Sequence, residues 1–303
     1  MDRLTAMTAF VRCVERGSFS AVGREMHLTQ PTVSKLIASL ERHLGGRLFA
    51  RSARPVALSG EAERFYQQCR AIIEAVETAE ASFKTSREEI AGVLHIASSV
   101  SFGRMQLMSR MRAFMRRYPS LRIALQLKDR AVDIVEQAID VAFRVGELED
   151  SNLIARRVGT AQRVTVGTPD YFRRHGEPRR PEDLKAHNCI LYTGLASRDV
   201  WPYVRDGRAY PVRVSGSFQT NSGEAVRSAT LAGIGIVLAP VWLFGEDIRA
   251  GRVKLVLTDY RPKPLPIHVL SPQNRRNSAK VKACADFFQA EFERDPFVSA
   301  YRA

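Results

Sequence analysis

The sequence predicts an α/β protein that begins with a small helical domain, continues into a long connecting helix, and ends in a larger domain of two α/β subdomains. Three observations predict this fold class. Two helices joined by a tight turn are expected over residues 18–48, and a narrow apolar seam at helical spacing runs over residues 61–84. From Gly92 onward, segments typical of strands alternate with segments typical of helices. We place the boundaries at 1–60, 61–91 and 92–303.

The first domain starts with a predicted helix over residues 3–16, and the second helix of the following pair is amphipathic. Thr29 stands where an N-cap is expected, and Pro31 falls in the first turn, where its missing N–H costs nothing. The apolar face repeats at steps of three and four residues. Its members are Val33, Ile37, Leu40 and Leu44.

The opposite face of this helix carries side chains that hydrogen bond or bear positive charge, which suits insertion into a DNA major groove. These side chains are Gln30, Thr32, Ser34, Lys35 and Arg42. A core helix with a solvated outer face would show the same periodicity. The next segment favours DNA binding, because residues 47–58 are basic, are interrupted by Pro55, and end in the apolar–polar alternation of a small β-wing. We therefore predict a winged helix-turn-helix.

Composition and charge agree with a protein that binds a polyanion such as DNA. The chain has 303 residues, enough for two or three cores, with a formal net charge of +14 and an ordinary 45% hydrophobic share. Residues 1–58 hold nine Lys or Arg against four Asp or Glu, yet most of the excess charge follows residue 91. Charge alone therefore does not locate a DNA site. Neither a membrane-spanning apolar run nor a signal peptide is recognised, so we expect a cytoplasmic protein without a membrane partner.

The connecting helix predicted over residues 61–84 would be about 36 Å long. Its narrow seam calls for a partner helix, and we expect a second copy of the chain to supply it. One more helix of a bundle is the alternative, which the glutamates flanking the seam disfavour. The predicted dimerisation residues are Phe65, Cys69, Ile72, Val76, Ala79 and Phe83.

The remaining residues predict a parallel sheet covered by helices. Expected strands are 93–97, 121–127, 141–145, 153–158, 164–167, 190–192, 213–218, 236–238 and 267–271. Expected helices are 105–118, 132–138, 222–232 and 279–294. We assign residues 92–162 and 268–303 to subdomain I and residues 163–267 to subdomain II.

A ligand in such a fold binds beyond the carboxyl ends of the strands. The first strand ends at Ser98, Ser99, Val100 and Ser101, directly before a helix whose free N–H groups suit an anion. We therefore hypothesise a small organic acid as the ligand, although helix capping by one serine is the simpler alternative. The opposing wall is expected from Arg144, Val145, Thr220, Asn221, Gly235 and Ile236, with Trp201 and His268 as weaker candidates.

The sequence lacks the motifs that would indicate an enzyme, a zinc site or an exported solute-binding protein. The sequence contains no G-x-S-x-G, no H-E-x-x-H and no complete phosphate loop, so we do not expect an enzyme. The four cysteines (Cys13, Cys69, Cys189 and Cys284) are far apart and form no C-x-x-C pair, which disfavours zinc. We expect neither a metal nor a cofactor. A plain solute-binding protein would need an export signal and would not carry the winged domain.

Residues 1–83 resemble the DNA-binding head and linker of LysR-type transcriptional regulators. The resemblance rests on Phe10-Val11, Val14-Glu15, residues 17–21, residues 29–34, Leu40-Glu41, Leu44-Gly45 and residues 48–51. It implies that Gln30, Pro31, Thr32, Ser34, Lys35 and Arg51 face DNA, and we add Arg54 from the same basic segment. Lys35 stands where arginine is commoner in the family, so a bidentate guanine contact becomes a single-point one. Residues 59–62 also depart from the family's usual Thr-x-Ala-Gly.

The rest of the chain resembles the family's sensing domain, which has the type 2 periplasmic-binding-protein fold. The anchors are residues 114–119, residues 140–142 and residues 231–236. The resemblance implies a homo-oligomeric regulator that binds double-stranded promoter DNA and a small-molecule effector, with RNA polymerase as a further candidate partner. Regulation without an effector, or through cysteine oxidation, is the alternative within the family.

Overall fold

The structure is a computed structural model of the whole chain. It describes residues 2–50, 58, 62–84, 90–129, 134, 137–148, 150–195, 199–275 and 277–295. The chain forms two compact units, and the main break between them falls after Val93. We call residues 2–84 the head and residues 90–295 the body, and describe each by itself.

The head is helical, and local capping explains where its helices begin and end. Its helices are α1 (Arg3–Arg16), α2 (Phe19–Glu25), α3 (Gln30–Leu44) and α4 (Ala62–Lys84). Asp2 and Ser18 accept backbone N–H groups at the starts of α1 and α2. Gly17 (φ 62°) and Gly45 (φ 70°) end α1 and α3 in the left-handed region, which glycine adopts without strain.

Phe10 of α1 lies in the centre of the head's core. Its ring lies 5.5 Å from that of Phe49, 5.8 Å from that of Phe65 and 6.3 Å from that of Tyr66. The predicted apolar face of α3 is buried at Val33, Ile37 and Leu40, whereas Leu44 is 42% exposed. The buried face of α3 therefore ends one turn before the helix does.

The segment after α3 folds back as the start of a wing. Phe49 forms an antiparallel bridge with Leu58, and the Glu41 carboxylate accepts the N–H groups of Leu48 (2.8 Å) and Phe49 (3.4 Å). The predicted wing between these two residues lies, apart from Ala50, outside the described residues.

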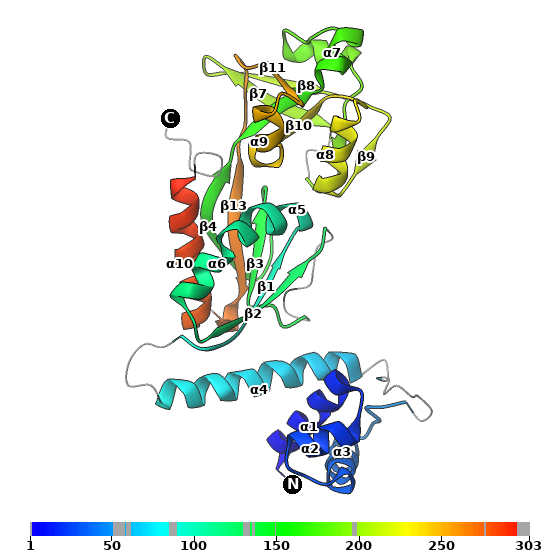
Figure 1. Cartoon of the computed structure of the whole chain (residues 1–303), viewed down its shortest axis with the longest axis vertical. Coiled ribbons are helices and arrows are strands. Elements are labelled where there is room, and N and C mark those ends of the chain that lie inside the picture. Colours follow the sequence, from blue (N-terminus) through cyan, green and yellow to red (C-terminus); the bar gives the residue numbers. More distant parts are fainter. Residues whose placement is uncertain are drawn as a thin grey trace. The chain divides into compact units, whose positions relative to one another are not determined.

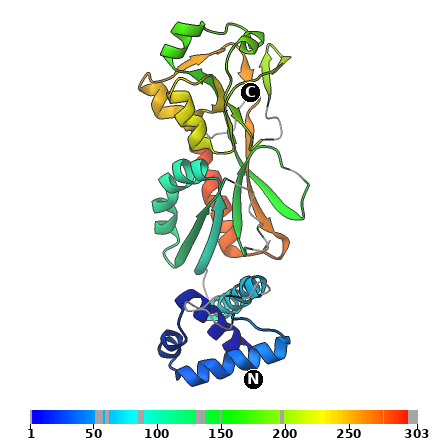
Figure 2. The same cartoon turned by 90° about the vertical axis from the view of Figure 1, so that its right-hand side faces the viewer.

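Subdomain I of the body is a five-stranded sheet with the order β2-β1-β3-β13-β4. Its strands are β1 (Gly92–Ser98), β2 (Leu121–Leu127), β3 (Val141–Val145), β4 (Leu153–Ala161) and β13 (Leu265–Pro272). The helical segments are α5 (Val100–Phe102), a π-helical turn (Gly103–Leu107), α6 (Met108–Arg117), a 3-10 turn (Gln273–Arg275) and α10 (Ala279–Arg294). Figures 1 and 2 show α6 and α10 alongside this sheet. Phenylalanines from α5, α10 and β3 pack together with ring centroids 5.1–6.4 Å apart: Phe102, Phe143, Phe288 and Phe292.

The prediction of a parallel sheet is wrong for part of subdomain I. β1 pairs with β3 in parallel, but β13 is antiparallel to both β3 and β4. The reason is that β13 re-enters the sheet after the whole of subdomain II, from the end at which the chain left it. The helix expected over residues 132–138 falls largely outside the described residues, and its described positions 134, 137 and 138 are turns.

Subdomain II contains three small sheets, with the orders β10-β5-β11, β12-β7-β8 and β6-β9. Its strands are β5 (Arg163–Gly167), β6 (Leu191–Tyr192), β7 (Val200–Arg205), β8 (Arg208–Arg213), β9 (Gln219–Thr220), β10 (Val237–Pro240), β11 (Lys254–Val256) and β12 (Arg261–Pro262). Its helices are α7 (Pro169–His175), a 3-10 turn (Pro181–Ala186), α8 (Gly223–Leu231) and α9 (Val241–Arg249). Its core includes Tyr171, Cys189, Trp201, Tyr203, Ile236 and Leu238.

The strand predicted over residues 213–218 is also wrong. Residue 213 ends β8, and residues 214–218 run as irregular chain against Cys189, where a Cβ on Gly216 would lie 1.9 Å from the Cys189 carbonyl oxygen. The α7 and α9 helices and the β7–β8 hairpin were not predicted.

The chain crosses between the subdomains twice. Gln162 joins β4 to β5, and residues 263–264 join β12 to β13. Subdomain II is thus inserted into subdomain I, as the sequence predicted. No described helix is both long enough and apolar enough to cross a membrane.

Candidate nucleic-acid interface and effector site

The N-terminal turn of α3 is held by its own hydroxyl groups. Thr29 Oγ1 accepts the N–H of Thr32 (3.3 Å), and the two threonine hydroxyls are 2.8 Å apart. Pro31 occupies the first turn, as predicted. The start of α3 is therefore fixed without help from other elements, which presents its first turns in one conformation.

A close approach of the backbone sets how α2 leads into α3. A Cβ on Gly23 would lie 2.9 Å from the Leu28 carbonyl oxygen and 3.3 Å from the Gln30 nitrogen. The Leu28 N–H donates to the Gly23 carbonyl at 2.7 Å, and His27 takes a positive φ of 56° in the turn. Only glycine at position 23 lets the turn come this close.

The structure leaves most of the predicted DNA-facing side chains of α3 accessible. Gln30, Pro31 and Lys35 are exposed, while Thr32 and Ser34 are half-buried. They share the side of α3 that does not enter the head's core. Arg51 and Arg54, the predicted wing arginines, lie outside the described residues.

The predicted dimerisation seam of α4 divides into two parts, and the structure corrects the prediction in the first part, at Cys69. Cys69 is 0% exposed within the head's own core, so it offers no free face to a second copy, whereas Phe65 stacks on Phe10 but is only half-buried. Ile72, in contrast, is 45% exposed, and Val76 is half-buried. The side chains of Ala79 and Phe83 are outside the described set.

In the body, the four predicted residues from the last position of β1 onward do not leave a free anion site at the helix start. The N–H of Val100 donates to the Asp129 carboxylate at 3.0 Å, so this position already holds a carboxylate of the chain itself. Ser99 is the N-cap residue of α5 but its side chain makes no capping hydrogen bond. Ser98 Oγ is buried without a hydrogen-bond partner among the described residues.

Arg144 lies near the end of β3 and brings a cation to this region. It is half-buried, and no carboxylate of the described residues forms an ion pair with it. Burial lowers the pKa of Arg144, and the nearby Tyr192 hydroxyl of subdomain II counters this effect. Burial likewise raises the pKa of Tyr192, with a further contribution from Asp129. Asp129 and Tyr192 were not predicted, because neither belongs to a recognisable motif.

Two residues of the predicted opposing wall are wrong. Ile236 is fully buried in the core of subdomain II, and Gly235 packs against Asn188, whose carbonyl oxygen would lie 2.1 Å from an added Cβ. Trp201, a weaker candidate, is also in that core. Val145 and Thr220 are half-buried and Asn221 is exposed, and Thr220 Oγ1 accepts the N–H of Ser222 at 3.1 Å.

The two subdomains touch where α8 begins. A Cβ on Gly223 would lie 2.4 Å from Ser101 Oγ, so the backbone of α8 rests directly on the buried Ser101. Nearby, the Arg104 guanidinium donates two hydrogen bonds of 2.8–3.1 Å to Glu224 Oε1 and a third of 2.9 Å to Oε2. These contacts join subdomain I to subdomain II.

The cysteines are not arranged for redox chemistry in the described part of the chain. All four are free and buried. Burial raises the pKa of Cys13 to about 11 and those of Cys69 and Cys189 to about 12, so the reactive thiolate is scarce at neutral pH. No group of three or more His, Cys, Asp or Glu side chains in this part of the chain could hold a metal ion.

Comparison with protein families agrees with this architecture. The model described as bacterial regulatory helix-turn-helix protein, lysR family, matches residues 4–63, and the model described as LysR substrate binding domain matches residues 87–293. The HTH-type transcriptional regulator DmlR of Escherichia coli is 31% identical over 293 residues, which cover 95% of this chain and 94% of that protein. CrgA of Neisseria meningitidis serogroup B is 29% identical over 286 residues, covering 94% and 95%.

Comparison with solved structures also finds transcription regulators that match most of this chain. The structure of CrgA from Neisseria meningitidis has a TM-score of 0.60 and 29% identity, covering 95% of this chain and 98% of that one. The full-length structure of the Vibrio cholerae virulence activator AphB has a TM-score of 0.57, 29% identity and the same coverage. The fold and the matched family models thus define a DNA-binding transcription regulator with an effector-binding domain. The chain belongs to the LysR-type family of transcriptional regulators.

Proposed function

We propose that this regulator reads its operator with the first turns of α3 and that a small organic acid, bound between the subdomains of the body, changes its binding to DNA. The observation that carries the ligand class is the half-buried guanidinium of Arg144, which lacks a carboxylate partner in the described chain. A buried cation is unfavourable until a charge of opposite sign meets it. A carboxylate ligand would supply that charge.

Neighbouring polar groups support the same ligand class. The Tyr192 hydroxyl lies near Arg144 from the other subdomain, and Ser98 Oγ has hydrogen-bonding capacity that nothing in the described chain uses. Buried polar atoms normally have partners, so a ligand with oxygen atoms would satisfy them. The effector's anion partner is therefore Arg144, rather than the helix start at Val100 that the sequence favoured.

The exposed polar face of α3 supports the DNA contact. The N-terminal residues of a recognition helix reach the base edges of the major groove. Gln30 can pair with adenine through its amide, and Lys35 can make a single contact with guanine or phosphate. We assign Pro31, Thr32 and Ser34 to the same surface, and Arg51 and Arg54 to the phosphate backbone beside it.

We further propose that the exposed part of α4 pairs with a second copy of the chain, beginning at Ile72. Two heads joined in this way would meet successive major grooves on an interrupted palindrome. A ligand that changes the relation between the subdomains would alter the spacing of the heads, which couples two sites through quaternary geometry.

A fluorescence anisotropy titration tests the DNA contact. The probe is the intergenic DNA upstream of the protein's own gene, and unrelated DNA is the competitor. The ionic strength is about 150 mM, so that long-range charge attraction is largely screened. Lys35→Ala should weaken specific binding by about 1–3 kcal/mol. Lys282→Ala, which removes the same charge from an exposed position in the body, is the matched control. Equal losses in both variants would mean that net charge alone attracts the DNA.

The same titration, repeated with a series of small organic acids, tests the ligand site. We first identify an acid that changes the DNA affinity or the DNA bend of the wild-type complex. With Arg144→Gln, the same effect should require a roughly tenfold higher concentration of that acid, because losing an ion pair worth about 1.4 kcal/mol weakens binding tenfold. DNA binding without the acid should stay unchanged. Arg179→Gln, on the exposed surface, is the control. An unchanged acid response in Arg144→Gln would remove that residue from the site.

A further inference from the structure

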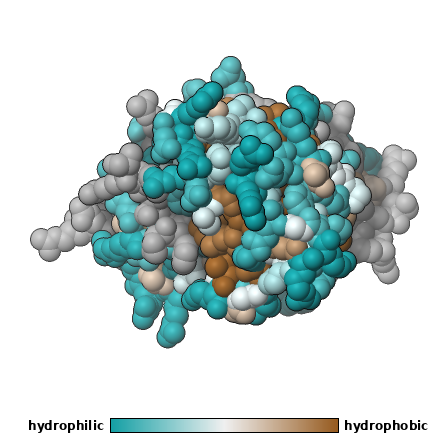
Figure 3. All heavy atoms as spheres, turned by 90° about the horizontal axis from the view of Figure 1, so that it is seen from above, coloured by the Kyte–Doolittle hydropathy of each residue, from teal (hydrophilic) through white to brown (hydrophobic). Residues whose placement is uncertain are grey.

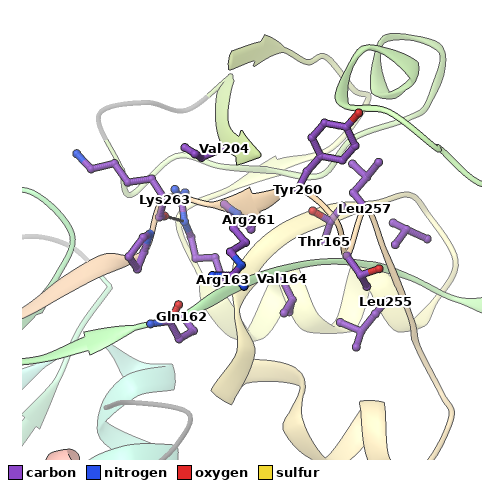
Figure 4. A pocket seen from close by; sticks show the side chains of 14 residues that line it. Gln162, Arg163, Val164, Thr165, Val204, Leu255, Leu257, Tyr260, Arg261 and Lys263 are labelled. Atoms are coloured by element: carbon purple, nitrogen blue, oxygen red, sulfur yellow. Dashed lines mark hydrogen bonds between the residues drawn. The ribbon is translucent and has the colours of Figure 1, made fainter. Parts of the chain in front are cut away.

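Subdomain II holds a pocket that shares no residue with the proposed effector site. It has a volume of about 430 Å³, within the range of small-molecule pockets. Figure 4 shows its walls, which come from β5, β7, β11 and β12 and from the chain on either side of β12. Both segments that join the subdomains, at Gln162 and at residues 263–264, contribute to it.

Three cationic side chains line this pocket, and Arg163 is the buried one, because Arg261 and Lys263 are exposed. It is only 7% exposed, and its Nε donates to the Lys263 carbonyl at 2.6 Å, the bond drawn as a dashed line in Figure 4. This bond ties one connecting segment to the other. Among the described residues, no carboxylate forms an ion pair with Arg163. Burial lowers the pKa of Arg163 to about 10, so the guanidinium remains charged at neutral pH.

The other polar and charged groups of the pocket do not neutralise Arg163. The ammonium of Lys263 pairs with Glu147 at 3.1 Å, and Thr165 Oγ1 is 2.8 Å from the Tyr203 hydroxyl. Gln162 lines the pocket, and its buried amide nitrogen has no hydrogen-bond partner among the described residues. The buried guanidinium of Arg163 and the amide N–H₂ group of Gln162, both donors, therefore face no carboxylate or other acceptor of the described residues except the Lys263 carbonyl.

The remaining walls are mainly apolar. They include Val164, Val204, Leu255, Leu257, Pro262 and Pro264. Val204 and Leu255 are 38% and 37% exposed, which is unusual for large apolar side chains on a strand. Figure 3 shows the face on which subdomain II lies, where a small apolar area stands among hydrophilic side chains. A ligand that fits this lining has an apolar portion as well as a negative end.

We propose that this pocket binds a small monocarboxylate with an apolar body, whose carboxylate pairs with Arg163 and accepts from the Gln162 amide while its apolar part lies against Val204 and Leu255. The pocket is a site additional to the one at Arg144. Because its walls include both connecting segments, an acid bound here would stiffen the hinge between the subdomains. It would thereby alter the response to an effector in the cleft without occupying the cleft.

A fluorine NMR titration of the full-length protein tests this site with 4-fluorophenylacetate as the probe. 4-Fluorophenylacetamide, nearly identical in shape but uncharged, is the matched control ligand. We expect saturable binding of the acid below about 10 mM, as the small number of ligand atoms allows, and much weaker binding of the amide. Arg163→Gln should weaken the acid about tenfold, the factor that corresponds to a lost charge pair of about 1.4 kcal/mol.

Two further variants keep the test decisive. Val204→Trp changes an exposed side chain, so it should fold, and it should block the apolar part of the pocket. Arg144→Gln removes the cation of the proposed effector site, so the acid binding that persists in this variant and is lost in Arg163→Gln belongs to the pocket. The proposal is overturned if the acid does not bind, if the amide binds as well as the acid, if Val204→Trp binds normally, or if only Arg144→Gln loses binding. The last result would place the probe in the cleft and would leave the proposed function standing.

Discussion

At Asp247 a carboxylate with 1% of its side chain exposed accepts hydrogen bonds of 2.7–2.8 Å from Arg227 and Arg252. Burial by itself raises the pKa of Asp247, but the hydrogen bonds and charges of the two arginines outweigh it, and the net pKa is lower than the ordinary value. This side chain therefore joins α8, α9 and the turn after α9 as an anion.

The Asp247 cluster predicts a pH dependence of stability. Because the folded-state pKa lies below the unfolded one, the contribution of Asp247 is complete above about pH 4 and is lost as the pH falls through the folded-state pKa. Asp247→Asn should cost about 3 kcal/mol of unfolding free energy at pH 7, since it leaves two arginines without their anion. It should also flatten the loss of stability in acid.

Urea denaturation followed by tryptophan fluorescence measures both effects, because both tryptophans, Trp201 and Trp242, lie in the body. Asp170→Asn is the control: Asp170 also pairs with two arginines, Arg173 and Arg174, but on the surface, where ion pairs contribute about 1 kcal/mol or less. Equal costs for the two variants would contradict the role of burial.

Among the elements, the turn between α2 and α3 depends on one glycine. Replacing a helical glycine by alanine normally stabilises a helix by about 1 kcal/mol. Gly23→Ala should instead weaken DNA binding, because its Cβ would meet the Leu28 carbonyl and the start of α3. DNA affinity by anisotropy gives the measurement. Gly46→Ala, whose Cβ would meet nothing within 4 Å, should bind DNA normally.

The second element with a testable surface is α4. Ile72→Glu places a charge at the most exposed apolar position of its described side chains and should shift the protein toward monomers in sedimentation velocity, since a buried unpaired charge is costly. Gln67→Glu makes the same charge change on another side of the helix and should leave the oligomeric state unchanged. A dimer that survives Ile72→Glu would place the interface elsewhere.

At the scale of the whole molecule, the contact of α8 with Ser101 holds the two subdomains of the body together. Gly223→Ala should lower the unfolding free energy of the body by about 1–3 kcal/mol, the usual cost of overpacking, because the added Cβ would lie 2.4 Å from Ser101 Oγ. Gly245→Ala, in α9, has nothing within 4 Å of the added Cβ and should stabilise instead. Tryptophan fluorescence in urea compares the two, and a neutral Gly223→Ala would show that the subdomains separate freely.

Local patterns in the sequence determined much of the fold. The helices Arg3–Arg16 and Ala279–Arg294 and the strands Leu121–Leu127 and Val141–Val145 were predicted with the bounds observed. Their apolar spacing and their caps involve residues only a few positions apart, so a single sequence is enough to predict these elements. The β7–β8 hairpin also carried a local signal, because Asp206-Gly207 is a typical two-residue turn, and both residues have positive φ.

Only the tertiary structure decided which side chains meet. Asp129 reaches the N–H of Val100 across 29 residues, and Arg163 reaches the Lys263 carbonyl across 100. Such pairings have no sequence period, so the serines at the end of β1 looked like a free anion site and Ile236 looked like a wall residue. The direction of β13 was decided in the same way, by where the inserted subdomain returns the chain. The sequence by itself determined the family, the helix-turn-helix head and the exposed face of α3, because these depend on local spacing. The charge partner that we propose for the ligand depends on which partly buried cation the fold leaves without an anion among the described residues, and this follows from distant contacts alone.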